Sequence, residues 1–174
     1  MDLLVRIQDI TENKLLQYEG DHPMKKMDEL QKVVGEQKRE VHYQFNLTRS
    51  GRFLLVKGAV EGTLVFDCDR CLEPFDFPQQ EKFRVTLLPA ESQRTLFGDQ
   101  DMSEEELEVG IYQGECLDLK TIMEEQILLG IPMKKICSDT CRGICSQCGN
   151  NLNVNNCSCS PPDNSDHPFA GLRQ

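Results

Sequence analysis

The chain has 174 residues, of which 39% are hydrophobic and 28% charged, with nine cysteines, no tryptophan and a net charge of −10. This length suffices for one ordinary domain with a small appended module. No run approaches the roughly 18 apolar residues of a membrane helix, and the charged N-terminal segment is not typical of a secretory signal. We therefore expect a cytoplasmic protein with reduced thiols rather than a disulfide framework.

The charge is unevenly distributed along the chain. Residues 31–60 carry six Lys and Arg against two Glu, whereas residues 99–108 carry six acids and no base. The overall acidity argues against a broad electrostatic attraction to nucleic acid. The local basic strip allows a limited contact with RNA, but a solvated hairpin with lysines along its edge explains the same charges.

The hydrophobic pattern predicts a short strand, a short helix and then a series of strands. Residues 3–10 alternate in part and predict a short strand, and apolar residues at helical spacing between residues 24 and 38 predict a short amphipathic helix. Further strands are expected over residues 41–48, 53–60, 62–68, 75–89 and 106–115. Pro78 marks an edge or a bulge. Together they predict an antiparallel sheet of four or five strands that can curl into a barrel.

The remaining segments complete an α+β fold with two or three helices. Residues 90–106 are polar and acidic and predict a surface loop. Residues 117–132 predict the clearest helix, with Asp118 as its N-cap and Gly130 and Pro132 at its end. We expect an α+β core domain over residues 1–135, a cysteine-rich metal-binding segment over 136–159 and a disordered tail over 160–174.

The cysteine-rich segment is too small and too polar to fold by burying apolar surface. Structural zinc takes four thiolates in a tetrahedron, and a Cys-x-x-Cys turn supplies two of them. The pair Cys145 and Cys148, followed by Gly149, has this form. The second pair is either Cys157 with Cys159 or Cys137 with Cys141. An iron–sulfur cluster and reduced cysteines in a flexible segment remain alternatives.

Three cysteines lie outside this segment. Cys68 and Cys71, in the sequence CDRC, are either a second metal pair, which raises the number of ligands to eight, or two small side chains packed in a turn. A redox pair is disfavoured because Pro74 and a strand follow rather than a helix. Cys116 stands alone and is expected to be a core thiol.

No catalytic constellation is visible. The sequence lacks the glycine-rich nucleotide-binding motifs, the Gly-x-Ser-x-Gly nucleophile elbow and the His-Glu-x-x-His zinc motif. Its three histidines lie far apart in the chain. We therefore expect no catalytic residues and a protein that is not an enzyme.

The sequence KGAVEGTLVFDCDRCLEPF, followed by LDLKTIMEEQILLGIPMKKIC and the cysteine-rich end, resembles the YceD-like family. These are bacterial proteins, with relatives in plastids, that are linked to accumulation of large-subunit ribosomal RNA. The resemblance covers roughly residues 40 to 159. Arg70, between Cys68 and Cys71, matches the family's Cys-x-Arg-Cys turn. Some members lack the cysteine-rich end, which implies a supporting, structural role for zinc.

The resemblance implies a non-catalytic ribosome-biogenesis factor that binds large-subunit ribosomal RNA or a ribosome-assembly protein. It implies no association with a membrane and no small-molecule substrate. The candidate RNA contacts in the basic strip are Arg49, Arg52 and Lys57. Two alternatives stay open: a metal-dependent ribosomal RNA processing enzyme, and a redox- or zinc-responsive regulator.

Overall fold

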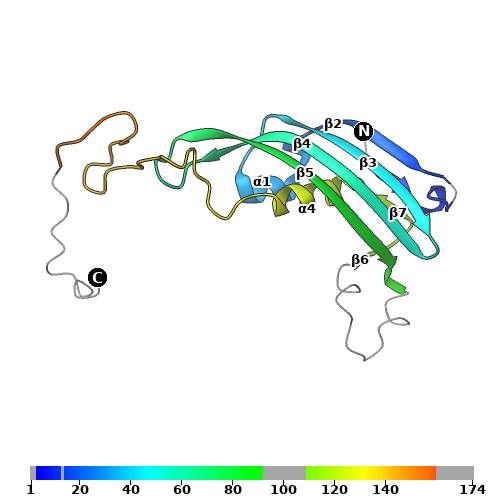
Figure 1. Cartoon of the computed structure of the whole chain (residues 1–174). Helices are drawn as coiled ribbons and strands as arrows, with labels where there is room; N and C mark the ends of the chain where they lie inside the picture. Colours follow the sequence, from blue (N-terminus) through cyan, green and yellow to red (C-terminus); the bar gives the residue numbers. More distant parts are fainter. Residues whose placement is uncertain (1–2, 13, 92–108, 160–174) are drawn as a thin grey trace, which may run out of the picture. The chain divides into compact units, whose positions relative to one another are not determined.

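The computed structural model describes residues 3–12, 14–91 and 109–159 (Figure 1). The chain divides into two compact units. The first, which we call the sheet unit, comprises Met1–Val65 and Asp76–Pro132. The second, the cysteine unit, comprises Phe66–Phe75 and Met133–Gln174. The predicted disordered tail and most of the predicted acidic loop lie outside the described residues.

The main sheet has five strands in the order β2-β3-β4-β5-β6. Their bounds are Leu16–Pro23 for β2, Glu40–Ser50 for β3, Phe53–Asp67 for β4, Pro74–Pro89 for β5 and Val109–Tyr112 for β6. β2, β3 and β4 pair antiparallel, whereas β6 runs parallel to the end of β5. β2 and β6 remain at the two edges, so the sheet is open and does not close into a barrel.

A second, two-stranded sheet joins β1 (Leu4–Arg6) to β7 (Cys116–Asp118). Two short 3₁₀ turns, η1 (Ile7–Asp9) and η2 (Met24–Lys26), follow β1 and β2. The α-helices whose bounds the described residues give are α1 (Asp28–Val34) and α4 (Leu119–Leu129). Among the helices that the structure describes, none is long and apolar enough to cross a bilayer.

Both α-helices lie on the same side of the main sheet (Figure 1). Strand β3 alternates strictly, with Val41, Tyr43, Phe45 and Leu47 buried, and we call the face that they form the inner face. Ile127 of α4 borders the same small interior gap as Val41. The apolar side of α4 therefore covers the inner face, which forms the core of the sheet unit.

Two glycines keep β4 continuous across a close approach of neighbouring side chains. A Cβ on Gly58 would lie 2.3 Å from the ring of Phe83, and one on Gly62 would lie 2.7 Å from Met24. The Phe83 ring packs edge-on against Phe45, with centroids 5.8 Å apart. The sequence predicts two strands here, but the structure has one, because these glycines make room for core side chains instead of ending the strand.

The two predicted helices and the strand predicted over residues 106–115 are confirmed. α1 lies within residues 24–38, α4 follows Asp118 and ends before Gly130, and β6 lies within residues 106–115. Pro78 is tolerated in β5 because β6 pairs only from Thr86 onward, so β4 is the one described strand beside it. β2 has no counterpart among the predicted strands.

Replacing Asp118 with alanine is expected to lower the free energy of unfolding by about 1 kcal/mol. Its carboxylate accepts hydrogen bonds from the Lys120 backbone N–H (2.9 Å) and the Thr121 hydroxyl (3.1 Å) at the start of α4. Urea titration followed by far-UV circular dichroism measures the loss. Asp118→Asn keeps an acceptor and should lose much less; equal losses for both variants would contradict a capping role.

Candidate functional site

The cysteine unit has little apolar material with which to fold. Its described core consists of the buried Cys68, Cys71 and Cys141, with Phe75 and Ile136 packed against them, and the buried ring of Phe66 beside Phe75. A cluster this small buries too little surface to offset the conformational entropy of the segment. The unit therefore requires another source of stability.

Eight cysteines of this unit form two separate groups of four. The hairpin tetrad consists of Cys68, Cys71, Cys137 and Cys141, and the terminal tetrad of Cys145, Cys148, Cys157 and Cys159. Within each tetrad, all four sulfur atoms lie within 4.8 Å of one another. The structure thus joins Cys137 and Cys141 to the CDRC turn, and Cys157 and Cys159 to the Cys145–Cys148 turn.

The spacing of the sulfur atoms matches a tetrahedral metal site. In the hairpin tetrad, the Sγ atoms of Cys68 and Cys141 are 3.8 Å apart, and those of Cys71 and Cys137 are 3.7 Å apart. A tetrahedron with zinc–sulfur bonds of about 2.3 Å has edges of about 3.8 Å. A disulfide bond would require about 2.0 Å, and all nine cysteines are free thiols.

The two Cys-x-x-Cys turns share one backbone geometry. The N–H of Leu72 donates to the carbonyl of Cys68 (2.9 Å), and the N–H of Gly149 donates to the carbonyl of Cys145 (2.9 Å). Both donors directly follow the second cysteine and have positive φ, 61° for Leu72 and 73° for Gly149. Leucine rarely adopts this conformation, so the sequence offers the Cys-x-x-Cys spacing of CDRC as a sign of a second such turn but not the glycine that follows it in the first.

Hydrogen bonds hold residues 135–141 against the CDRC turn. The N–H of Asp69 donates to the carbonyl of Lys135 (2.8 Å), and the N–H of Lys135 donates to the Asp69 carboxylate (2.6 Å). The Arg70 guanidinium donates to the carbonyls of Cys141 (3.0 Å) and Asp139 (3.3 Å). Arg70 therefore positions the backbone that carries Cys141, the fourth thiol of the hairpin tetrad, which gives the arginine of the Cys-x-Arg-Cys turn a structural role.

The same arginine also contacts the segment that leads to the terminal tetrad. The carbonyl of Arg70 accepts a hydrogen bond from the N–H of Ile144 (3.0 Å). Gly143 has φ 75°, and a Cβ there would lie 3.0 Å from this carbonyl. A glycine is thus required at residue 143 both by its conformation and by the close approach of Arg70.

Backbone and amide N–H groups point at the sulfur atoms of the hairpin tetrad. Cys68 Sγ accepts from the N–H groups of Cys137 (3.4 Å) and Arg70 (3.5 Å), and Cys141 Sγ accepts from the Asn153 amide (3.3 Å). Burial alone would raise the pKa of Cys68, but the backbone donors outweigh it and lower this pKa to about 6. Burial and the neighbouring thiols raise the pKa of Cys137 to about 12.

The terminal tetrad repeats this pattern. The backbone N–H groups of Cys148 and Gln147 lower the pKa of Cys145 to about 6. The Cys148 thiol, followed by burial, raises the pKa of Cys159 to about 12. In each tetrad the pKa of at least one thiol is lowered, while neighbouring thiols, among them Cys141 and Cys148, oppose the ionisation of another.

A divalent cation removes this opposition because it lets all four thiols ionise at once. Both tetrads could therefore hold a metal ion, and each offers four sulfur donors without a carboxylate. Four protein ligands fill a tetrahedral coordination sphere, which is the arrangement of structural rather than catalytic sites.

The candidate RNA contacts of the sheet unit do not share one surface. Lys57 is exposed, and it lies on the face of β4 opposite to that of Leu54, the Cα partner of Arg49. Arg49 donates to the carbonyl of Gly51 (3.0 Å), and the Arg52 guanidinium lies 5.8 Å from the centroid of the Phe53 ring.

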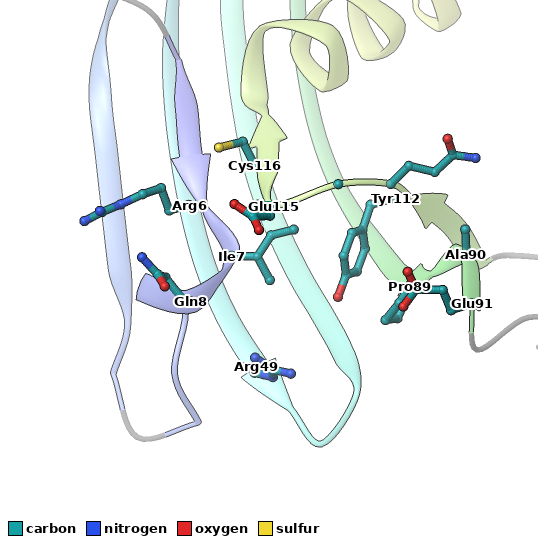
Figure 2. A pocket seen from close by; sticks show the side chains of 12 residues that line it. Arg6, Ile7, Gln8, Arg49, Pro89, Ala90, Glu91, Tyr112, Glu115 and Cys116 are labelled. Atoms are coloured by element: carbon teal, nitrogen blue, oxygen red, sulfur yellow. The ribbon is translucent and has the colours of Figure 1, made fainter.

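Arg49 also lines a cavity of about 680 Å³ in the sheet unit (Figure 2). Its wall includes Arg6, Glu115 and Cys116. Arg6 is already paired with Asp9 at 3.0 Å, so the cavity shows no clear preference for a charged ligand. The expectation that Cys116 is a core thiol is wrong: it is exposed, because the short strand β7 buries Leu117 and turns the neighbouring thiol outward.

The histidines of the sheet unit do not assemble a site. His22 is buried, its Nε2 has no hydrogen-bond partner among the described residues, and burial lowers its pKa. His42 is half-buried on β3, with Nδ1 3.0 Å from the Asp21 carboxylate.

Comparison with known proteins connects this architecture to a family. Residues 56–174 match the family described as large ribosomal RNA subunit accumulation protein YceD. The uncharacterized proteins Mb2951c of Mycobacterium bovis and Rv2926c of Mycobacterium tuberculosis are each 32% identical over 96 residues, which is 55% of this chain and 44% of the relative. The chain thus covers less than half the length of these curated relatives, and no solved structure matches. Because the family match spans well over half of the chain, including all eight cysteines of the two tetrads, this protein belongs to the YceD family.

Proposed function

We propose that this protein is a non-catalytic ribosome-biogenesis factor that supports the accumulation of large-subunit ribosomal RNA. The observation that carries the proposal is the family match over residues 56–174, since the family is described by this effect. The protein acts in the cytoplasm by binding precursor RNA or an assembly partner, and this binding favours maturation of the large subunit.

The proposed cofactor is structural zinc, with one ion in each tetrad. Two observations support this choice: the sulfur–sulfur distances of 3.7 and 3.8 Å in the hairpin tetrad, and the all-thiolate donor sets of both tetrads. Zinc suits such sites because it has no redox chemistry and accepts tetrahedral thiolate ligands. The ions would fold the cysteine unit and hold its surface in shape for a partner.

The alternative functions make different demands on these sites. A metal-dependent processing enzyme needs a metal with an open position for substrate or water, whereas each tetrad supplies four protein ligands. A redox- or zinc-responsive regulator would release zinc under mild peroxide and lose its effect on ribosomal RNA at the same time. Such a regulator would be excluded if the protein kept its zinc at peroxide concentrations that oxidise other exposed thiols.

The proposal predicts a specific defect in cells that lack the protein. Mature large-subunit ribosomal RNA should fall relative to small-subunit ribosomal RNA, and precursors should accumulate, because large-subunit assembly loses a supporting factor. Northern blots and sucrose gradients measure both quantities, and expression of the intact chain should restore them. A normal ratio of the two RNAs, together with absence of the protein from precursor large-subunit fractions, would refute the proposal.

A further inference from the structure

One face of the main sheet carries neither of the two α-helices that the structure describes. Both α1 and α4 lie against the inner face (Figure 1). On the opposite side, which we call the outer face, Asn46 of β3 and Lys57 of β4 are Cα partners. Lys57 is exposed there, as are Lys82 and Arg84 of β5.

The register of β4 and β5 brings these three cations together. The two strands are hydrogen-bonded neighbours. Gln80 donates to the Glu61 carboxylate (3.5 Å) on the outer face, and Phe83 lies against Gly58 on the inner face. Both contacts fit a single antiparallel register, in which Lys57 lies opposite Arg84. Lys82 is two residues away on the same face of β5, a separation of about 7 Å.

The three cations form no ion pair with another described residue. Acids lie on the adjoining part of the same face: Glu61 accepts from Gln80 (3.5 Å), Glu19 accepts from the Gln44 amide (3.1 Å), and Asp21 contacts His42. A cluster of unpaired positive charge on a protein with a net charge of −10 is a local exception.

Protection of a sheet edge does not account for this cluster. Lysines often guard exposed strand edges, and Lys82 and Arg84 precede the point at which β6 begins to pair with β5. Lys57, however, belongs to β4, which has β3 and β5 on its two sides. A cation on an interior strand has no edge to protect.

The chemistry of the outer face fits a phosphate backbone better than a protein partner. Protein interfaces are anchored by buried apolar and aromatic side chains. None of the exposed large apolar side chains of the described residues belongs to β2, β3, β4 or β5. Instead the cations are flanked by amides, such as Gln17 bonded to Asn46 at 2.9 Å. Such polar donors contact phosphates and riboses. Phe53, which lies on the same face of β4 as Lys57, is half-buried and already contacts the Arg52 guanidinium, which lies 5.8 Å from its ring centroid.

We propose that the part of the outer face that carries Lys57, Lys82 and Arg84 docks the sugar–phosphate backbone of RNA, with these three cations as the phosphate contacts. This inference rests on the proposed function and assigns its RNA contact to a defined surface. Recognition at this face is independent of base sequence and strongly dependent on salt. The acids on the adjoining part of this face, Glu19, Asp21 and Glu61, limit the RNA to the end that carries the three cations.

The test compares the full-length protein with the triple variant Lys57→Gln, Lys82→Gln, Arg84→Gln. The probe is an RNA duplex of about 20 base pairs, long enough to span a sheet face, and affinity is measured by fluorescence anisotropy over a range of salt concentrations. The matched control, Lys14→Gln, Lys25→Gln, Lys38→Gln, changes the net charge equally but leaves the outer face intact. Thermal unfolding of both variants checks that they remain folded.

The proposal expects the outer-face variant to bind the duplex about tenfold more weakly and its salt slope to be smaller by about 3, while the control keeps both values. Equal losses in the two variants would show a nonspecific charge effect and would overturn it. The proposal would also be overturned if the wild-type protein bound polyglutamate but not the RNA duplex, and if the outer-face variant lost that binding. This result would indicate an acidic protein partner. If the outer-face variant still restores ribosomal RNA levels in cells and binds the duplex normally, this inference fails while the proposed function stands.

Discussion

Replacing the two cysteines of the CDRC turn, Cys68→Ser with Cys71→Ser, is expected to reduce the zinc content from about two ions per chain to about one. We call this the hairpin variant. The hairpin tetrad would keep only Cys137 and Cys141, and two thiolates hold zinc far too weakly to retain it through purification. Elemental analysis of protein purified under reducing, chelator-free conditions measures the change. Because structural zinc contributes on the order of 10 kcal/mol to the folding of small metal-binding segments, the loss is also expected to disorder residues 133–141.

The matched variant Cys145→Ser with Cys148→Ser should remove the other ion and leave the hairpin tetrad loaded. Cys116→Ser is the control, because Cys116 is exposed and belongs to neither tetrad. It should retain both ions. A wild-type protein with one zinc, or a hairpin variant that still binds two, would contradict two independent tetrads.

Hydrogen exchange can show where the stability is lost. The amides of Lys135 and Ile144 are hydrogen-bonded to Asp69 and Arg70, so both should lose protection in the hairpin variant. The buried strand β3 has its own core on the inner face and should keep its protection. Loss of protection throughout the chain would mean that the two units do not fold separately.

The sequence allowed prediction of the local parts of the metal centres but not of how they assemble. A Cys-x-x-Cys turn followed by Gly149 is a local pattern, and it predicts a pair of ligands. The partners of Cys68 and Cys71 lie 73 and 66 residues away, at Cys141 and Cys137. No periodicity specifies such a pairing, because it depends on the fold that brings the CDRC turn beside the segment after α4.

The same distinction applies to the strands. Strand β3 was predictable because one of its faces is fully buried and the other polar, which produces a clear alternation. β2 was missed because it is an edge strand: only His22 is buried in it, and Gly20 and Pro23 resemble turn residues. Gly20 instead accommodates the Tyr43 side chain, whose hydroxyl would lie 3.0 Å from a Cβ at that residue. Tertiary packing, invisible in the local sequence, decides such cases.

A buried carboxylate connects the two helices of the sheet unit. Met27, the N-cap residue of α1, makes no side-chain capping hydrogen bond. The N–H of Leu30, in the first turn, donates instead to the Glu124 carboxylate of α4 at 2.7 Å. Glu124 is only 5% exposed. It therefore caps α1 from another helix and places a negative charge at its N-terminus, where the helix dipole favours one.

Replacing Glu124 with alanine is expected to lower the free energy of unfolding by about 2 kcal/mol, since it leaves a buried N–H without its charged acceptor. With only seven residues, α1 is too short to persist without this support, so the amide of Leu30 should also lose its protection from hydrogen exchange. Glu124→Gln keeps an acceptor oxygen and should lose about half as much. Glu125→Ala, at an exposed site one residue away, should change stability by no more than about 0.5 kcal/mol. Equal losses for Glu124→Ala and Glu125→Ala would show that α1 is held by its apolar contacts alone.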